Sequence, residues 1–144
     1  MSKLLLAEDD EFSRDMLGRR LERHGFEMLT AADGKEALLA ARQHRPDLIL
    51  MDLNMPVMDG LTAMRALKSD PRTFRIPIIV LTADASPENV AEALTAGCQS
   101  FETKPIVLRK LLERIEEALG TAKPAAAAAP ADYGSPTSTN PAQK

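Results

Sequence analysis

Short apolar runs alternate along the chain with longer segments in which apolar residues recur every three or four positions. Runs of four to six apolar residues are typical of buried strands, and the longer spacing is typical of amphipathic helices. The predicted strands span 3–7, 26–31, 47–52, 76–81 and 98–103. One predicted helix follows each strand. This alternation favours an α/β fold, with a parallel sheet covered by helices on both faces.

Residues that suit helix ends mark the limits of these segments. Asp9 or Asp10 can cap the first helix, whose apolar stripe begins at Phe12. Ser86 can cap the fourth helix, and Val107 begins the stripe of the last one. Few apolar residues occur in the fourth helix, which predicts a marginally packed, mobile element.

Composition excludes several classes of function. The chain carries 18 Lys and Arg against 21 Asp and Glu, with no basic run, so neither nucleic acid nor a membrane surface is an expected partner. The single Cys98 excludes an internal disulfide and suits a reducing compartment. With no apolar span of about 18 residues and no signal-peptide pattern, we expect a cytoplasmic protein.

The composition changes after Gly120. Residues 121–144 are half Ala or Pro and contain no Leu, Ile, Val or Phe. Such a segment cannot bury enough apolar area to offset the entropy of ordering it. We therefore expect one folded domain over 1–120, followed by a disordered Ala/Pro-rich tail over 121–144.

Polar residues stand at the carboxyl ends of four predicted strands. Glu8 and Asp9 follow the first strand, Asp52 ends the third, Thr82 follows the fourth and Lys104 follows the fifth. If the strand order is 2-1-3-4-5, these residues converge on one crevice at the switch point of the sheet.

Carboxylates gathered in one crevice repel one another. Two unit charges ~4 Å apart cost about 4 kcal/mol at an effective dielectric constant near 20. A divalent cation offsets this repulsion, and Mg²⁺ prefers oxygen ligands of this kind. Together with a lysine and a hydroxyl, the set has the parts for phosphoryl transfer, in which Asp52 is the nucleophile.

The residues and their spacing resemble the receiver domain of bacterial two-component response regulators. The intervals are 43 residues from Asp9 to Asp52, 30 from Asp52 to Thr82 and 22 from Thr82 to Lys104. The resemblance covers about residues 2–120. It implies a flavodoxin-like α/β fold: a five-stranded parallel sheet in the order 2-1-3-4-5, flanked by five helices.

The resemblance implies a role for each matching acid. Asp52 resembles the phosphoacceptor, which takes its phosphoryl group from a histidine. Asp9 resembles the direct Mg²⁺ ligand, Glu8 the acid that acts through water, and the backbone carbonyl of Asn54 a further metal contact. Asn54 and Asp84 hold the positions that tune hydrolysis of the acyl phosphate, and we expect them to make it short-lived.

Three further positions match the family. Thr82 resembles the switch hydroxyl that moves to the phosphoryl group, and Lys104 the lysine that pairs with the phosphate. The family implies a cis peptide bond before Pro105. Phe101 holds the position of the switch aromatic, where a phenylalanine can turn inward but cannot offer a hydroxyl to a partner.

The sequence alone leaves a second register open, in which Asp9 and Asp10 are the metal-binding acids. The family interval to Asp52 favours Glu8 and Asp9 instead. Asp10 is also the better placed of these acids to cap the first helix.

The predicted function is a phosphorylation-activated switch that catalyses only its own phosphorylation and dephosphorylation. The implied partners are a histidine kinase or histidine phosphotransfer protein, and a downstream protein that binds the face of the fourth helix, fifth strand and fifth helix. Two alternatives remain. One is a receiver module of a larger multidomain regulator or hybrid kinase; the other is a Mg²⁺-dependent phosphohydrolase, which would need a second acid where Asn54 stands.

Overall fold

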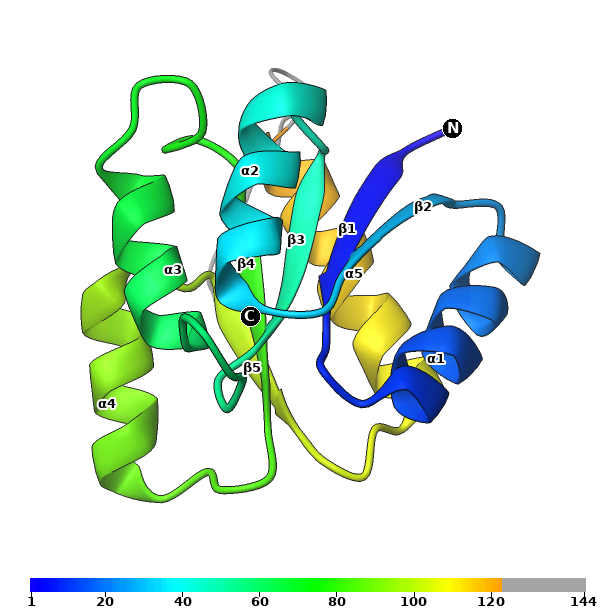
Figure 1. The fold of residues 1–144 in the computed structure, drawn as a ribbon. Coiled ribbons are helices and arrows are strands. Elements are labelled where there is room, and N and C mark those ends of the chain that lie inside the picture. The colour runs from blue at the N-terminus through cyan, green and yellow to red at the C-terminus, as the bar shows by residue number, and fades with distance from the viewer. Residues whose placement is uncertain (123–144) are drawn as a thin grey trace.

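The computed structural model describes residues 1–122, which form a three-layer α/β domain (Figure 1). The five strands are β1 (Lys3–Ala7), β2 (Glu27–Ala31), β3 (Leu48–Asp52), β4 (Ile78–Thr82) and β5 (Ser100–Thr103). The five helices are α1 (Glu11–Arg23), α2 (Gly34–His44), α3 (Gly60–Lys68), α4 (Pro87–Ala96) and α5 (Leu108–Ala122). Apart from its first two residues, the tail predicted for 121–144 lies outside the described part.

All strand pairs are parallel, and their order is β2-β1-β3-β4-β5, which confirms the expected fold. Every residue of the central strands β3 and β4 is buried, as expected for a sheet covered on both faces. The edge strands β2 and β5 are more exposed. None of the helices in the described part of the chain is both long and apolar enough to cross a bilayer.

Two apolar layers cover the two faces of the sheet. Helices α2, α3 and α4 pack on one face, where Ala37, Met64 and Ala93 belong to a single buried cluster (Figure 1). Helices α1 and α5 pack on the other face, where Leu21 and Ile115 belong to the second cluster. The carboxyl ends of the strands and the loops that follow them carry the candidate site.

Two strands begin two residues later than predicted. The strand β4 cannot begin before Pro77, because proline has no N–H to donate to the sheet. Before β5, the N–H of Cys98 donates to the carbonyl of Ala93 at 3.1 Å, so it belongs to the end of α4. This local hydrogen bond at the end of a helix leaves no trace in an apolar pattern.

The predicted apolar stripes are wrong at two helix starts. Phe12 is 72% exposed, whereas Leu21 in the same stripe is fully buried. Val107 lies before α5 and is 47% exposed. Both residues lie in the segments that follow the carboxyl ends of β1 and β5.

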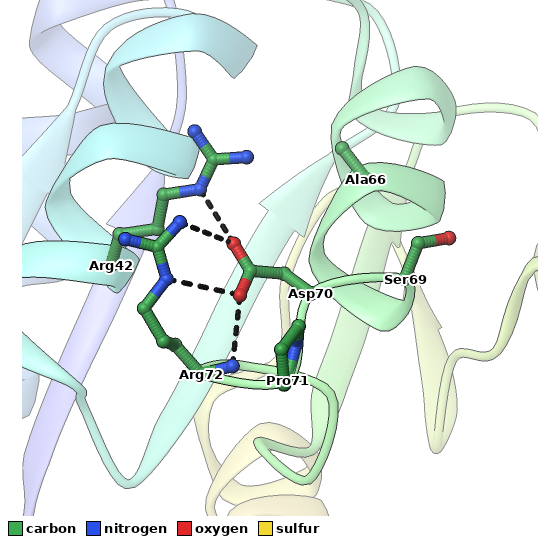
Figure 2. Close-up of a pocket in the computed structure, with 6 residues that line it drawn as sticks. All are labelled: Arg42, Ala66, Ser69, Asp70, Pro71 and Arg72. Atoms are coloured by element: carbon green, nitrogen blue, oxygen red, sulfur yellow. Dashed lines mark hydrogen bonds and ion pairs between the residues drawn. The ribbon is translucent and has the colours of Figure 1, made fainter.

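At the opposite end of the molecule, Asp70 links α2 to the loop that follows α3. Its carboxylate accepts a hydrogen bond from Arg42 Nε at 2.8 Å (Figure 2). Arg72 donates to the same carboxylate through Nη2 at 2.9 Å, Nε at 3.1 Å and its backbone N–H at 2.8 Å. Hydrogen bonds from Arg72, and then from Arg42, hold the pKa of Asp70 well below its ordinary value.

Asp70→Asn is expected to lower the free energy of unfolding at pH 7. A carboxyl whose pKa falls on folding stabilises the native state above its unfolded pKa and loses this contribution as the pH falls through the folded value. The difference in the free energy of unfolding between wild type and variant should therefore have its full size at pH 7. It should shrink as the pH falls below 3.8, the ordinary pKa of the carboxyl. Urea unfolding followed by circular dichroism measures it. A difference that does not vary with pH would contradict this account.

Asp15→Asn is the matched control for this experiment. Asp15 pairs with Arg19 at 3.1 Å, and both side chains are more than half exposed. Exposed pairs within one helix contribute little to stability. The control should therefore unfold at nearly the wild-type urea concentration over the same pH range.

Candidate functional site

The sheet register brings the polar strand ends to one level. The last residue pair between β1 and β3 is Ala7 with Met51. The next residues along the two strands are Glu8, directly after β1, and Asp52, which ends β3. The last residue of β4 is Thr82, whose carbonyl accepts a hydrogen bond from the Lys104 N–H at 2.7 Å. This backbone geometry places the predicted residues at a single edge of the sheet.

Lys104 joins two of the carboxylates directly. Its Nζ lies 2.8 Å from Glu8 Oε1 and 3.0 Å from Asp52 Oδ2. Glu8 and Asp52 are each only 4% exposed. Burial lowers the pKa of the Lys104 ammonium, but its hydrogen bonds to Glu8 and Asp52 outweigh this effect, so its pKa lies above the ordinary value. The lysine therefore carries its charge at neutral pH.

Glu8, Asp9 and Asp52 form a group that suits a hard cation. Each offers a carboxylate oxygen, and these oxygens lie within 4.8 Å of one another. Glu8 and Asp52 are buried, while Asp9 is exposed to solvent. Mg²⁺ prefers one or two carboxylates together with water molecules, and this half-open donor set fits that preference.

Asp10 has a different task from the other acids. Its Oδ2 accepts a hydrogen bond from the backbone N–H of Ser13 at 2.8 Å, which makes it the N-cap of α1. Hydrogen bonding to Ser13 lowers the pKa of Asp10. The geometry therefore places Glu8 and Asp9, rather than Asp10, with Asp52.

Arg14 supports the acidic turn and was not predicted from the sequence. Its Nη1 donates to the backbone carbonyl of Glu8 at 2.8 Å and to that of Asp9 at 3.4 Å. These contacts fix the turn that carries both acids. The sequence signal for this role is a basic residue one turn into a helix that begins with an acidic cap.

The loop after β3 is closed by backbone hydrogen bonds. The N–H of Gly60 donates to the Leu53 carbonyl at 3.0 Å, and the N–H of Gly34 donates to the Met58 carbonyl at 2.9 Å. A Cβ at Gly60 would overlap the carbonyl oxygen of Asp52, so α3 approaches β3 closely only because residue 60 is glycine. This closure sets the position of the backbone around Asp52.

Asn54 lies at the start of this loop. Its backbone N–H donates to Asp52 Oδ1 at 3.1 Å, so both oxygens of the Asp52 carboxylate are hydrogen-bonded. The side chain of Asn54 is exposed. The backbone N–H of Asn54 thus lies beside the acid, and the expected contact of its carbonyl with a metal ion stays a prediction.

Thr82 is buried, and its hydroxyl faces its own loop. The backbone N–H of Asp84 donates to Thr82 Oγ1 at 3.0 Å, and the hydroxyl donates to the Asp84 carbonyl at 3.1 Å. Within residues 1–122, no hydrogen bond joins this hydroxyl to Asp52 or Lys104. The sequence places Thr82 at the site but does not give this orientation.

Phe101 is partly buried on β5. It packs against the cluster that lies between the sheet and helices α2, α3 and α4. The peptide bond between Lys104 and Pro105 is cis, as the family resemblance implies. Phe101 thus belongs to the face formed by α4, β5 and α5, and the cis bond lies in the segment that joins β5 to α5.

A parallel sheet in this order, with a buried acid–lysine group at its switch point, defines the flavodoxin-like class of α/β domains with a polar site at the strand ends. Residues 4–116 match the response regulator receiver domain, and the chain belongs to that family.

Three relatives illustrate the match. The transcriptional regulatory protein PrrA of Mycobacterium tuberculosis is 40% identical over 120 residues, which are 81% of this chain and 49% of PrrA. The polar-differentiation response regulator DivK of Brucella anthropi is 36% identical over 119 residues, 83% of this chain and 97% of DivK. The solved receiver domain of the sensor histidine kinase PA1611 from Pseudomonas aeruginosa, with a magnesium ion coordinated in its active site cleft, is 32% identical.

That structure superposes with a TM-score of 0.78 and covers 83% of this chain and 98% of its own. The chain thus spans about half the length of the PrrA relatives and almost the full length of DivK. The domain is a two-component receiver, and its acids can hold a metal ion.

Proposed function

We propose that Asp52 accepts a phosphoryl group from a phosphohistidine on a kinase or phosphotransfer protein. The position of its carboxylate carries the proposal: it is buried at the end of β3, with Lys104 Nζ 3.0 Å from one oxygen. An Asp52 oxygen forms a new bond to phosphorus, while the bond between phosphorus and the donor nitrogen breaks and its electron pair returns to the imidazole. We place this exchange in the cytoplasm.

The neighbouring residues support this transfer electrostatically. Lys104 neutralises charge on the phosphoryl oxygens, since its ammonium already lies against both buried acids. Glu8, Asp9, Asp52 and the carbonyl of Asn54 would hold a magnesium ion. When bound, such an ion neutralises negative charge on the phosphoryl group.

The test is phosphorylation by acetyl phosphate with Mg²⁺, followed by intact-mass spectrometry. The wild-type chain should gain the mass of one phosphoryl group, and the gain should disappear with a chelator or in Asp52→Asn. The amide keeps the shape of the carboxylate but removes the nucleophile. A full gain of mass in Asp52→Asn would overturn the assignment.

We further propose that the protein has no separate substrate and catalyses only its own phosphorylation and dephosphorylation. A phosphohydrolase acting on other molecules would need a second acid two residues after Asp52, where Asn54 stands. Multiple turnover of a phosphate ester would contradict this assignment.

Asn54 and Asp84 are proposed to set the lifetime of the acyl phosphate. Both are exposed beside the site, where they can orient the attacking water. The Asn54→Ala, Asp84→Ala double variant should slow hydrolysis by about ten- to a hundredfold, the usual cost of losing an orienting contact. The decay of the phosphorylated mass after removal of acetyl phosphate measures this. An unchanged decay rate would show that neither residue sets the lifetime of the acyl phosphate.

Exposed apolar side chains at the same edge of the sheet suit a docking donor protein. Phe12 is 72% exposed, Val57 80% and Val107 47%. They lie after β1, β3 and β5 respectively, and therefore around the entrance to Asp52. We propose that a phosphohistidine-bearing partner covers them during transfer, because exposed apolar groups around a polar site are typical of an interface.

The downstream partner is proposed to bind the face of α4, β5 and α5. Helix α4 buries only Ala93 and Ala96, and Leu94 is 52% exposed, so the helix has little apolar contact to hold it. Movement of Thr82 toward the phosphoryl group, with Phe101 turning inward, would repack this face. The partner's preference for one arrangement limits how far the population can shift.

A further inference from the structure

One backbone carbonyl connects the switch hydroxyl to helix α4. The carbonyl oxygen of Asp84 accepts a hydrogen bond from Thr82 Oγ1 at 3.1 Å. The same oxygen accepts a second hydrogen bond from Asn89 Nδ2, also at 3.1 Å. Asn89 lies in the first turn of α4. Thr82 and α4 therefore share a single acceptor.

The side chain of Asn89 is not needed to start the helix. Ser86 is the N-cap of α4, and its Oγ accepts from the backbone N–H of Asn89 at 3.4 Å. The carboxylate of Asp84 accepts from the Ser86 N–H at 3.0 Å. Within residues 1–122, the contact with the Asp84 carbonyl is the one hydrogen bond of the Asn89 side-chain amide. The Asn89 amide thus stabilises the turn at Asp84 and takes no part in the N-cap of α4.

We infer that Asn89 is a positioning residue that keeps Thr82 turned away from Asp52 in the unphosphorylated protein. The inference rests on the proposed function, in which Thr82 moves toward the phosphoryl group. That movement breaks both hydrogen bonds between Thr82 and Asp84, and the Asp84 N–H must then find another acceptor. Asn89 opposes this rearrangement because it pins the Asp84 carbonyl in place.

The loose packing of α4 gives this contact a consequence for the output face. Since the helix buries only two alanines, a shift of the Asp84 turn is transmitted to α4 through Asn89 at little packing cost. Release of Thr82 and displacement of α4 are therefore one coupled event. The Asn89 amide makes that coupling specific, because it is the side-chain link between α4 and the acceptor of the switch hydroxyl.

The test is Asn89→Ala in the full chain, measured first without phosphorylation. NMR of the Thr82 methyl group should show its χ1 rotamer populations changing, since the carbonyl that holds the hydroxyl is no longer pinned. Phosphorylation by acetyl phosphate should become about fivefold faster, the factor expected for one net hydrogen bond. Mg²⁺ affinity, measured by NMR titration, should stay unchanged, because the acids are untouched.

Two variants separate this role from a general loosening of α4. Ser86→Ala removes the cap but keeps the amide, so it should lower stability and leave the Thr82 rotamers unchanged. Glu92→Ala should change neither quantity, since Glu92 is exposed and its side chain forms no hydrogen bond or ion pair among the described residues.

Unchanged Thr82 rotamers in Asn89→Ala, or the same change in Ser86→Ala, would overturn the inference. Failure of the wild type to accept a phosphoryl group would refute the proposed function instead. The rotamer measurement is made on unphosphorylated protein, so the two failures are distinguishable.

Discussion

Asp9→Ala is expected to reduce Mg²⁺-dependent phosphorylation at least about a hundredfold. Asp9 is the exposed member of the acidic group, and its carboxylate oxygen lies within 4.8 Å of oxygens on Glu8 and Asp52. Loss of a residue that only supports a metal ligand commonly costs ten- to a hundredfold in affinity or activity. Removal of Asp9, which we propose as a direct ligand, should cost more. Phosphorylation rates measured across a Mg²⁺ titration will separate weak metal binding from slow transfer.

Asp10→Ala is the matched control, because it removes an acid from the same turn. Asp10 caps α1, so its loss should lower the stability of the protein while Mg²⁺-dependent phosphorylation remains. The reverse outcome, with Asp10→Ala inactive and Asp9→Ala active, would show that the register of the metal-binding acids is Asp9 and Asp10.

Gly60→Ala is expected to disturb the site and the fold together. The added Cβ would overlap the Asp52 carbonyl oxygen, which belongs to the buried central strand and has no room to yield. Overpacking of this kind typically costs about 1–3 kcal/mol, and a clash with backbone belongs at the upper end. Because the strain falls on Asp52 itself, phosphorylation should also slow in the fraction that folds.

Gly18→Ala provides the comparison within the same chain. Gly18 lies inside α1, and a Cβ there would meet nothing within 4 Å. Alanine should raise the free energy of unfolding by about 0.5–1 kcal/mol, because it lowers the entropic cost of forming the helix. Urea unfolding of both variants measures the contrast. Equal stabilities would show that the close approach of α3 to β3 is not a constraint on the fold.

The sequence predicted the fold because its local signals agree with one another. Apolar runs, helix caps at Asp10 and Ser86, and the alternation of short and long segments all indicate the same series of strands and helices. Both caps are present in the structure. The strand order came from the family resemblance, since periodicity alone does not determine which strands are neighbours.

The site could be predicted as a set of residues but not as a geometry. The strand ends give the positions of Asp52, Thr82 and Lys104, because a parallel sheet collects them at one edge. The bridge from Lys104 to both Glu8 and Asp52 depends on side-chain distances that no spacing encodes. The orientation of Thr82 depends in the same way on the turn at Asp84.

Exposed apolar residues were the other source of error. Phe12 fits the helical spacing of the core, yet it lies beyond the part of α1 that contacts the sheet. Periodicity gives the direction of a side chain around the helix, but not whether the sheet extends beneath it. The wrong prediction concerns a residue at the rim of the proposed site, where we propose that the exposed Phe12 contacts the phosphohistidine-bearing partner.

Chemical trapping identifies the phosphorylated residue. Borohydride reduces an aspartyl phosphate to homoserine, which peptide mass spectrometry locates in the sequence. After phosphorylation with acetyl phosphate and Mg²⁺, we expect homoserine at position 52 and at no other aspartate. Homoserine at Asp9 or Asp10, or a phosphoryl group that resists reduction because it is not an acyl phosphate, would contradict it.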